Sequence, residues 1–107
     1  MAEPTGDELV AMLAAMANPL RLLILARLAD GRDYVSRLAR EIGVSRPLLH
    51  MHLQRLEAAG LVVGSLELSE DGKAMKFFEL ADFDLRLNRS TLAAAAQTLT
   101  THKEEPR

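Results

Sequence analysis

One stretch, SRPLLHMHLQRLEAAG from Ser45 to Gly60, constrains the fold more than any other part of the chain. Ser45 is suited to accept hydrogen bonds from the free amides of a first helical turn, where Pro47 is also tolerated. Gly60 can supply the left-handed residue that ends such a helix. The stretch therefore predicts a helix with a defined start and stop.

This predicted helix has two distinct faces. At about 100° per residue, apolar side chains at spacings of four and three gather on one face, which is expected to pack inward. The inward residues are Leu49, Leu53 and Leu56, and the outward face carries Pro47, His50, Met51, Gln54 and Arg55.

The segment just upstream, Val35 to Val44, predicts a short amphipathic helix that Gly43 interrupts before the next cap. Two helices joined by a turn of about three residues with a Gly have the spacing of a helix-turn-helix, here over about residues 35–60. Its inward stripe is Val35, Leu38, Ala39 and Ile42.

Two alternating runs follow, Leu61 to Leu68 and Ala74 to Leu80, about a polar turn that contains a Gly. This pattern predicts a β-hairpin over about residues 61–80. A helix-turn-helix followed by a hairpin is a winged helix, which is an α+β fold that is mostly helical.

The flanking segments predict three more helices. Thr5 and Glu8 have capping-box spacing at the start of the first, and Asn18 precedes Pro19 at the start of the second. The second is apolar around most of its circumference and is therefore expected in the centre of the core. After an extended segment, Asn88 is a cap for a last helix over about residues 89–103.

Several linked motifs resemble the ArsR-type family of small bacterial and archaeal winged-helix transcriptional repressors. They are MANPLRLLILARLADG, LAREIGVSRPLLHMHLQRLEAAGLV and SEDGKAMKFFEL, which together span roughly Met16 to Leu87. The resemblance implies a homodimer built by the first and last helices. The small residues of the first helix also suit a close subunit contact. The expected interface residues are Leu9, Met12, Met16, Leu92, Ala95, Ala96 and Leu99.

Length and charge limit the alternatives. A chain of 107 residues is expected to form a single domain over 1–107, and a net charge of −2 argues against coating nucleic acid by charge alone. Residues 34–60 nevertheless carry four arginines against two glutamates, a net charge of +2, whereas residues 67–84 carry −4. The helix-turn-helix is therefore locally basic in an acidic chain.

Other classes of protein are disfavoured. No run approaches the roughly 20 apolar residues of a membrane span, no signal segment opens the chain, and the absence of cysteine excludes thiol chemistry. No catalytic motif such as GxSxG, HExxH or a Walker loop occurs. We expect a cytoplasmic protein that is not an enzyme and has no membrane contact.

The outward face of the Ser45–Gly60 helix has side chains suited to a DNA major groove. Arginine pairs with guanine or phosphate, glutamine with adenine, histidine with either, and an apolar side chain can contact a thymine methyl. Lysines on the hairpin can reach phosphates, although Glu70 and Asp71 beside them repel DNA. The predicted DNA contacts are Ser45, Arg46, Pro47, His50, Met51, Gln54, Arg55, Lys73 and Lys76.

Two residues of this helix have a different expected role. Leu48 lies to one side, so packing against the hairpin or a second subunit is favoured over a base contact. His52 lies at the border of the inward face, which favours a hydrogen-bonded structural histidine over a base contact.

A metal site is not expected. Cadmium and arsenic sensors of the resembled family carry a Cys-x-Cys pair where this chain has Tyr34 and Ser36. A second family site needs an Asp-x-His pair, but the aligned positions are Arg89, Ser90 and Thr91. Only His102 and Glu105 have the remaining spacing, and half a site is a weak candidate. We predict no metal and no cofactor.

The expected function is therefore that of a homodimeric repressor that occupies an operator in double-stranded DNA. The alternative is a winged helix that binds another protein through an apolar patch of Leu48 and Met51. No effector is predicted from the residues.

Overall fold

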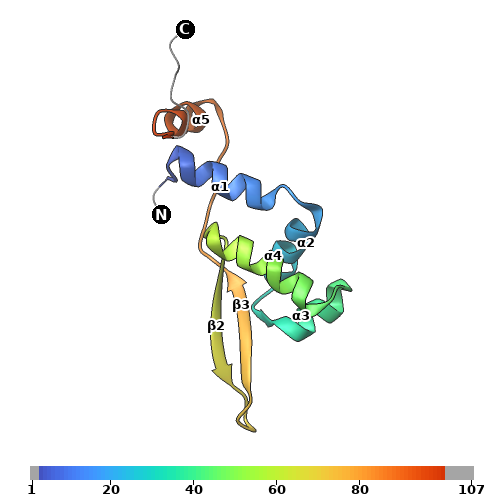
Figure 1. Cartoon of the computed structure of the whole chain (residues 1–107). Coiled ribbons are helices and arrows are strands. Elements are labelled where there is room, and N and C mark those ends of the chain that lie inside the picture. Colours follow the sequence, from blue (N-terminus) through green and yellow to red (C-terminus); the bar gives the residue numbers. More distant parts are fainter. Residues whose placement is uncertain (1–2, 101–107) are drawn as a thin grey trace.

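The computed structural model describes residues 3–100, which form five helices and one three-stranded antiparallel sheet (Figure 1). In chain order the elements are α1 (Gly6–Met16), α2 (Pro19–Leu28), β1 (Asp33–Tyr34), α3 (Val35–Ile42), α4 (Arg46–Ala58), β2 (Val62–Leu68), β3 (Ala74–Leu80) and α5 (Arg89–Ala96). The predicted α+β winged helix-turn-helix is confirmed.

Helix α4 begins and ends, and helix α3 ends, where the predicted cap residues lie. The side-chain oxygen of Ser45 accepts a hydrogen bond from the amide of Leu48 at 3.2 Å. Gly43 ends α3 with a φ of 90° and Gly60 follows α4 with a φ of 80°, a left-handed region that disfavours side chains. These caps fix the length of both helices and the turn between them.

The core lies between the helices and the inner face of the sheet. Leu49, Leu53 and Leu56 of α4 are fully buried, as the inward face predicts. They pack in one cluster with residues of the other elements: Ala15, Ile24, Leu25, Leu28, Leu38, Ala39, Leu61, Val62 and Phe78. The inward face of α4 is thus fixed in the core, and its opposite face is exposed.

The sheet has the strand order β1-β3-β2. The hairpin was predicted to within one residue, but the first strand was not predicted at all. Strand β1 is only two residues long, with Asp33 opposite Phe78 and Tyr34 opposite Phe77. A strand of two residues has no periodicity to detect, and only the tertiary structure creates it.

Arg32 attaches the hairpin to the rest of the protein. Its guanidinium forms two hydrogen bonds with the carboxylate of Glu67 on β2, one of them 2.9 Å long. The same guanidinium lies 4.4 Å from the centre of the Phe77 ring on β3. These contacts cross both strands of the hairpin, which projects beyond the helices (Figure 1).

The expectation that α2 lies in the centre of the core is wrong for one side of the helix. Leu22 is 58% exposed and Leu23 is 42% exposed, whereas Ile24, Leu25 and Leu28 are buried. Helix α2 packs against α1, α3, α4 and β3 on its buried side only. A chain of this size has no further layer to cover the outer side.

The two ends of the described chain meet. The capping box of Thr5 and Glu8 at the start of α1 is present, as predicted. The amide of Gly6 donates a 2.6 Å hydrogen bond to Oγ1 of Thr98, just beyond α5. Helices α1 and α5 therefore form one end of the molecule, far from the tip of the hairpin (Figure 1).

The last helix is shorter than the predicted range of about 89–103. Asn88 caps α5 as predicted, but the helix ends at Ala96. Beyond it the amides of Gln97, Thr98 and Leu99 bond to carbonyls only three residues earlier, a tighter turn. The side chains of Thr98 and Thr100 bond to α1 instead of continuing the helix. Residues 101–103 lie outside the described part of the chain.

Within residues 3–100, no single helix is long and apolar enough to cross a membrane. Helices α1 and α2 reach that length and composition only as a pair that is bent by 97°.

Candidate nucleic-acid interface

The outward face of α4 is open to solvent from its first turn to its last. Met51, at the centre of that face, is 39% exposed. The other predicted contacts from this helix are also exposed: Ser45, Arg46, Pro47, His50, Gln54 and Arg55. Because the three core leucines hold the opposite face, these side chains can meet a partner without disturbing the core.

The structure brings two of the predicted DNA contacts together. Arg46, in the first turn of α4, and Lys76, on β3, line one groove of about 210 Å³. The start of α3 forms the far wall of this groove through Tyr34 and Ser36. Two cationic side chains from different elements therefore line the space between α4 and the hairpin.

The start of α3 adds hydrogen-bond donors to this groove. Its N-cap residue, Tyr34, makes no side-chain capping hydrogen bond. The amides of the first turn, which form the positive end of the helix dipole, therefore have no side-chain acceptor from the N-cap. Ser36 lies in that turn. The sequence analysis did not predict it as a DNA contact and named it only as the residue in place of a metal-binding cysteine. The helix-turn-helix spacing could have indicated Ser36 as a candidate contact, because the first helix of this motif crosses the DNA backbone.

The tip of the hairpin carries opposite charges. The hydroxyl of Ser69 hydrogen-bonds to the carboxylate of Asp71, and this bond lowers the pKa of Asp71. Asp71 therefore stays charged beside Lys73, and both are exposed. The tip remains a weaker candidate for DNA contact than the groove of Arg46 and Lys76.

Arg55 lies apart from the other candidates. It lines a groove of about 330 Å³ between α1, α2 and α4, together with Arg21. The groove of Arg46 and Lys76 does not include it. The helical spacing of nine residues between Arg46 and Arg55 places them on opposite sides of α4.

His52 is the structural histidine that the sequence predicts. It is 7% exposed, and its Nδ1 accepts a 3.0 Å hydrogen bond from Nε of Arg21 on α2. Burial lowers the pKa of His52, and the nearby charges of Arg21 and Arg55 lower it further. Its imidazole is therefore neutral at neutral pH and serves as an acceptor within the protein.

Leu48 does not join the core. It is 40% exposed and is not part of the apolar cluster, and its packing against the hairpin stays a prediction. Its packing against a second subunit stays a prediction.

The predicted dimer residues fall into two groups. Leu9 is 7% exposed, and Met12 and Met16 pack against the core, so these side chains are largely used within the chain. Leu92 of α5 is 49% exposed. Ala96 is exposed, and Ala95 and Leu99 are half-buried.

Helix α1 also presents an apolar stripe that was not predicted. Val10 is 56% exposed and Leu13 is 36% exposed, on the side of the helix that turns away from the core. The sequence could not choose between the two apolar sides of α1, because alanines make the helix apolar on most sides after Asp7 and Glu8.

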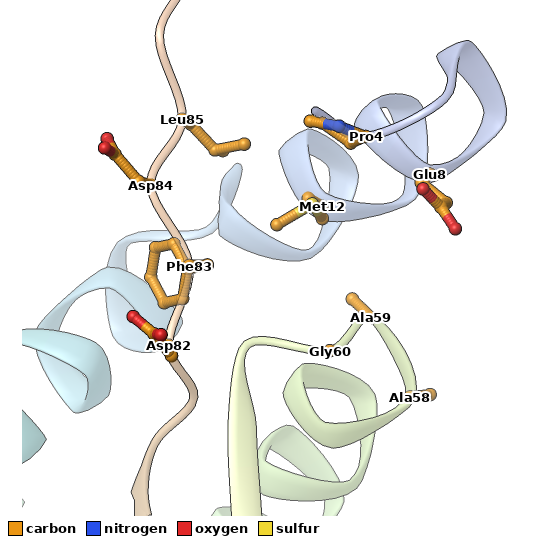
Figure 2. Close-up of a pocket in the computed structure, with 10 residues that line it drawn as sticks. All are labelled: Pro4, Glu8, Met12, Ala58, Ala59, Gly60, Asp82, Phe83, Asp84 and Leu85. Atoms are coloured by element: carbon orange, nitrogen blue, oxygen red, sulfur yellow. The ribbon is translucent and has the colours of Figure 1, made fainter. Parts of the chain in front are cut away.

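A pocket of about 450 Å³ lies near the end of α4, away from the candidate DNA contacts (Figure 2). Met12, Phe83 and Leu85 give it an apolar interior. The carboxylates of Glu8 and Asp84 point away from this interior in different directions (Figure 2). The carboxylates of Glu8 and Asp84 therefore do not converge on one bound cation.

Within residues 3–100, no group of three or more His, Asp or Glu side chains is placed to hold a metal ion. The weak candidates His102 and Glu105 lie outside the described residues.

Comparison with known proteins supports the same class of protein. The sequence profile of the bacterial regulatory protein arsR family matches residues 18–63. An uncharacterized HTH-type transcriptional regulator of Methanocaldococcus jannaschii is 32% identical over 85 residues, which are 79% of this chain and 88% of that protein. The HTH-type transcriptional repressor SmtB of Mycobacterium tuberculosis is 38% identical over 53 residues, which are 50% of this chain but only 39% of the repressor.

A solved fragment of a possible ArsR-family transcriptional regulator from Mycobacterium bovis has the same fold. Its solution structure, described as a homodimeric winged helix-turn-helix DNA-binding domain, has a TM-score of 0.60 at 24% identity and covers 85% of this chain and 74% of that one. Its crystal structure has a TM-score of 0.62 at 26% identity, with coverage of 85% and 86%.

Proposed function

The chain belongs to the ArsR family of bacterial regulatory proteins, and from that premise we propose that it is a homodimeric repressor that binds a specific operator. As a member of this family it is a DNA-binding transcriptional regulator and not an enzyme. The observation that carries the proposal is the geometry of α4. Its inner face is fixed in the core by three buried leucines, while its outer face is exposed from end to end.

Base contacts are assigned to the centre of this face. Gln54 can pair with adenine through its amide, and Met51 can contact a thymine methyl group. His50, one turn before Gln54, can donate to or accept from a base edge. These three side chains would determine which sequence is bound.

Phosphate contacts are assigned to the groove between α4 and the hairpin. Arg46 and Lys76 supply two cations, and Ser36 lies at the first-turn amides of α3, a position that favours an anion. Ser45 and Pro47 would approach the backbone at the start of α4, and Lys73 at the hairpin tip. These contacts would orient α4 on the duplex without reading sequence.

Dimerisation is assigned to the end of the molecule formed by α1 and α5. Val10 and Leu13 on α1 and Leu92 on α5 leave apolar surface exposed there. Two copies joined at this end would each present one α4 to a half-site, as a two-fold operator requires. We also propose that residues 1–107 form a single domain and that the protein acts in the cytoplasm, where its DNA target would lie.

Titration of fluorescent duplexes against the purified protein tests this function. An operator selected from a random pool should bind at least about a thousandfold more tightly than a scrambled duplex, as is typical of specific sites. Affinity should fall steeply as salt is raised, because phosphate contacts release counterions. The variant Arg86→Gln serves as the control, because this exposed arginine lies before α5 and belongs to neither the proposed DNA contacts nor the proposed dimer contacts.

The opposite result would favour a protein partner. If the selection yields no preferred sequence and binding to any duplex is insensitive to salt, the exposed Leu48 and Met51 become a patch for another protein.

A further inference from the structure

The groove that contains Arg55 is lined by alanines and arginines alone. It lies where α1, α2 and α4 meet and has a volume of about 330 Å³. Alanines supply its walls, and Arg21 and Arg55 supply its only charges. The groove is widely open to solvent, so it can cover a small molecule from one side.

Within residues 3–100, neither arginine forms an ion pair. Arg27, Arg32 and Arg37, in contrast, each pair with a carboxylate. His52, whose ring is affected by both groove arginines, is neutral and provides no countercharge. The groove therefore concentrates positive charge in a chain whose net charge is −2.

The hydrogen bonds of Arg21 leave part of its guanidinium free. Its Nε donates to Nδ1 of His52, and its Nη1 donates to the carbonyl oxygen of Ala15 at 3.4 Å. Its Nη2 has no protein acceptor among the described residues. The free Nη2 of Arg21 and the guanidinium of Arg55 line the same groove, and each can donate a charge-assisted hydrogen bond to a carboxylate.

The walls of the groove define the rest of the ligand. Ala11 and Ala15 come from α1, and Ala58 and Ala59 come from the end of α4. Methyl groups offer no hydrogen bonds, and they leave room that larger side chains would fill. An apolar body about as large as one aromatic ring would satisfy these walls by contact alone.

We propose that this groove, defined by Arg21, Arg55 and the alanines that line it, binds a small organic carboxylate with an apolar body. The carboxylate meets the two guanidinium groups and the apolar body lies against the alanines. This binding does not depend on the proposed DNA function, because every group involved lies within the free protein.

The position of Arg21 also predicts a regulatory effect. Arg21 is the hydrogen-bond partner of His52, which lies on the DNA-reading helix, and it also bonds to α1, which lies at the proposed dimer end. A carboxylate that draws its guanidinium outward competes with both bonds. The bound ligand therefore loosens α4 and weakens binding to the operator.

Benzoate is the probe for the site, and the binding test uses the protein without DNA. Amide NMR shifts of Ala11, Ala14 and Ala58 should move in a saturable way as benzoate is added. Benzamide, which has the same shape without the charge, should give no saturable shift. Arg55→Gln should weaken benzoate binding about tenfold or more, since a charged hydrogen bond is lost.

The control variant is Arg89→Gln, which removes an equal charge from α5 and should bind benzoate like the wild type. Equal binding of benzoate by Arg55→Gln, or equal binding of benzamide by the wild type, would overturn the site. So would inorganic phosphate that binds as tightly as benzoate, because the apolar walls would then contribute nothing.

A second measurement tests regulation and separates the site from a DNA contact. Saturating benzoate should lower the operator affinity of the wild type about fivefold, a typical coupling, and leave that of Arg55→Gln unchanged. If Arg55→Gln instead binds DNA more weakly with a flatter salt slope and does not respond to benzoate in any assay, Arg55 is a phosphate contact. Benzoate binding with an unchanged operator affinity would overturn the regulatory effect alone.

Discussion

The amide of Gly6 and Oγ1 of Thr98, 92 positions apart in the chain, are joined by a hydrogen bond of 2.6 Å. At this point α1 and the end of α5 are in such close contact that a methyl group on Gly6 would lie 2.1 Å from the carbonyl oxygen of Ala95. A glycine is therefore required here for the close approach of two backbones, not for an unusual backbone angle.

Replacing Gly6 with Ala should destabilise the protein by about 1–3 kcal/mol, the usual cost of forcing extra volume into packed structure. Helix propensity alone would favour Ala by up to about 1 kcal/mol, so a net loss identifies the clash. Urea unfolding measures the change, with Ser90→Ala on exposed α5 as a control. A more stable Gly6→Ala variant would show that the two segments do not approach so closely.

Two substitutions on α4 should impair DNA binding in different ways. Gln54→Ala should lose about 1–3 kcal/mol at one base position and relax specificity there. Arg46→Ala should weaken binding to all sequences and flatten the salt slope by about one unit, because it removes a phosphate contact. Titrations against operator and scrambled duplex at several salt concentrations distinguish the two. Identical losses on both duplexes for Gln54→Ala would remove its role in base recognition.

Leu92→Glu should convert a dimer into a monomer of 11.8 kDa. Leu92 is exposed within one chain, so the carboxylate would not disrupt the core, but it would be buried unpaired in the proposed interface. Light scattering at micromolar concentration measures the mass. Leu66→Glu, at a leucine on the hairpin that is still more exposed than Leu92, should leave the dimer intact. A wild-type protein that is itself monomeric would contradict the interface.

Protonation of His52 should destabilise the protein in mildly acidic solution. Burial lowers the pKa of His52 in the folded state, so the unfolded chain binds more protons in this range. Its contribution to the free energy of unfolding is fully present above about pH 6.5, the ordinary pKa of histidine, and decreases as the pH falls below that value. Denaturant unfolding between pH 5 and pH 8 measures the effect.

His52→Asn keeps an acceptor near Arg21 but cannot be protonated, so it should reduce this pH dependence. His50→Asn, which makes the same change at an exposed histidine of the same helix, is the matched control. Equal curves for all three proteins would exclude His52 as the responsible group.

Zinc, cadmium or arsenite should not alter DNA affinity. The chain has no cysteine, and residues 3–100 contain no group of three metal-binding side chains. Operator titrations with and without each metal test this expectation, with a chelator as the reference. A zinc effect that disappears in His102→Ala would identify the segment after Thr100 as a metal site.

Local patterns in the sequence determined the elements and the inward face of α4. Ser45, Gly43 and Gly60 set the helix ends through bonds and angles that involve only neighbouring residues, and the leucine spacing set the buried face. Short-range physics is sufficient for such features, because caps and helical periodicity act within a few positions.

Only the tertiary structure decided the features that depend on distant residues. The two-residue strand β1 exists because β3 supplies its partners, and α5 ends early because Thr98 and Thr100 bond to α1. The sequence shows Arg21, His52 and Arg55 as three separate basic residues. The fold places them together because α2 packs against α4 there. Local sequence patterns do not predict where two helices pack against each other.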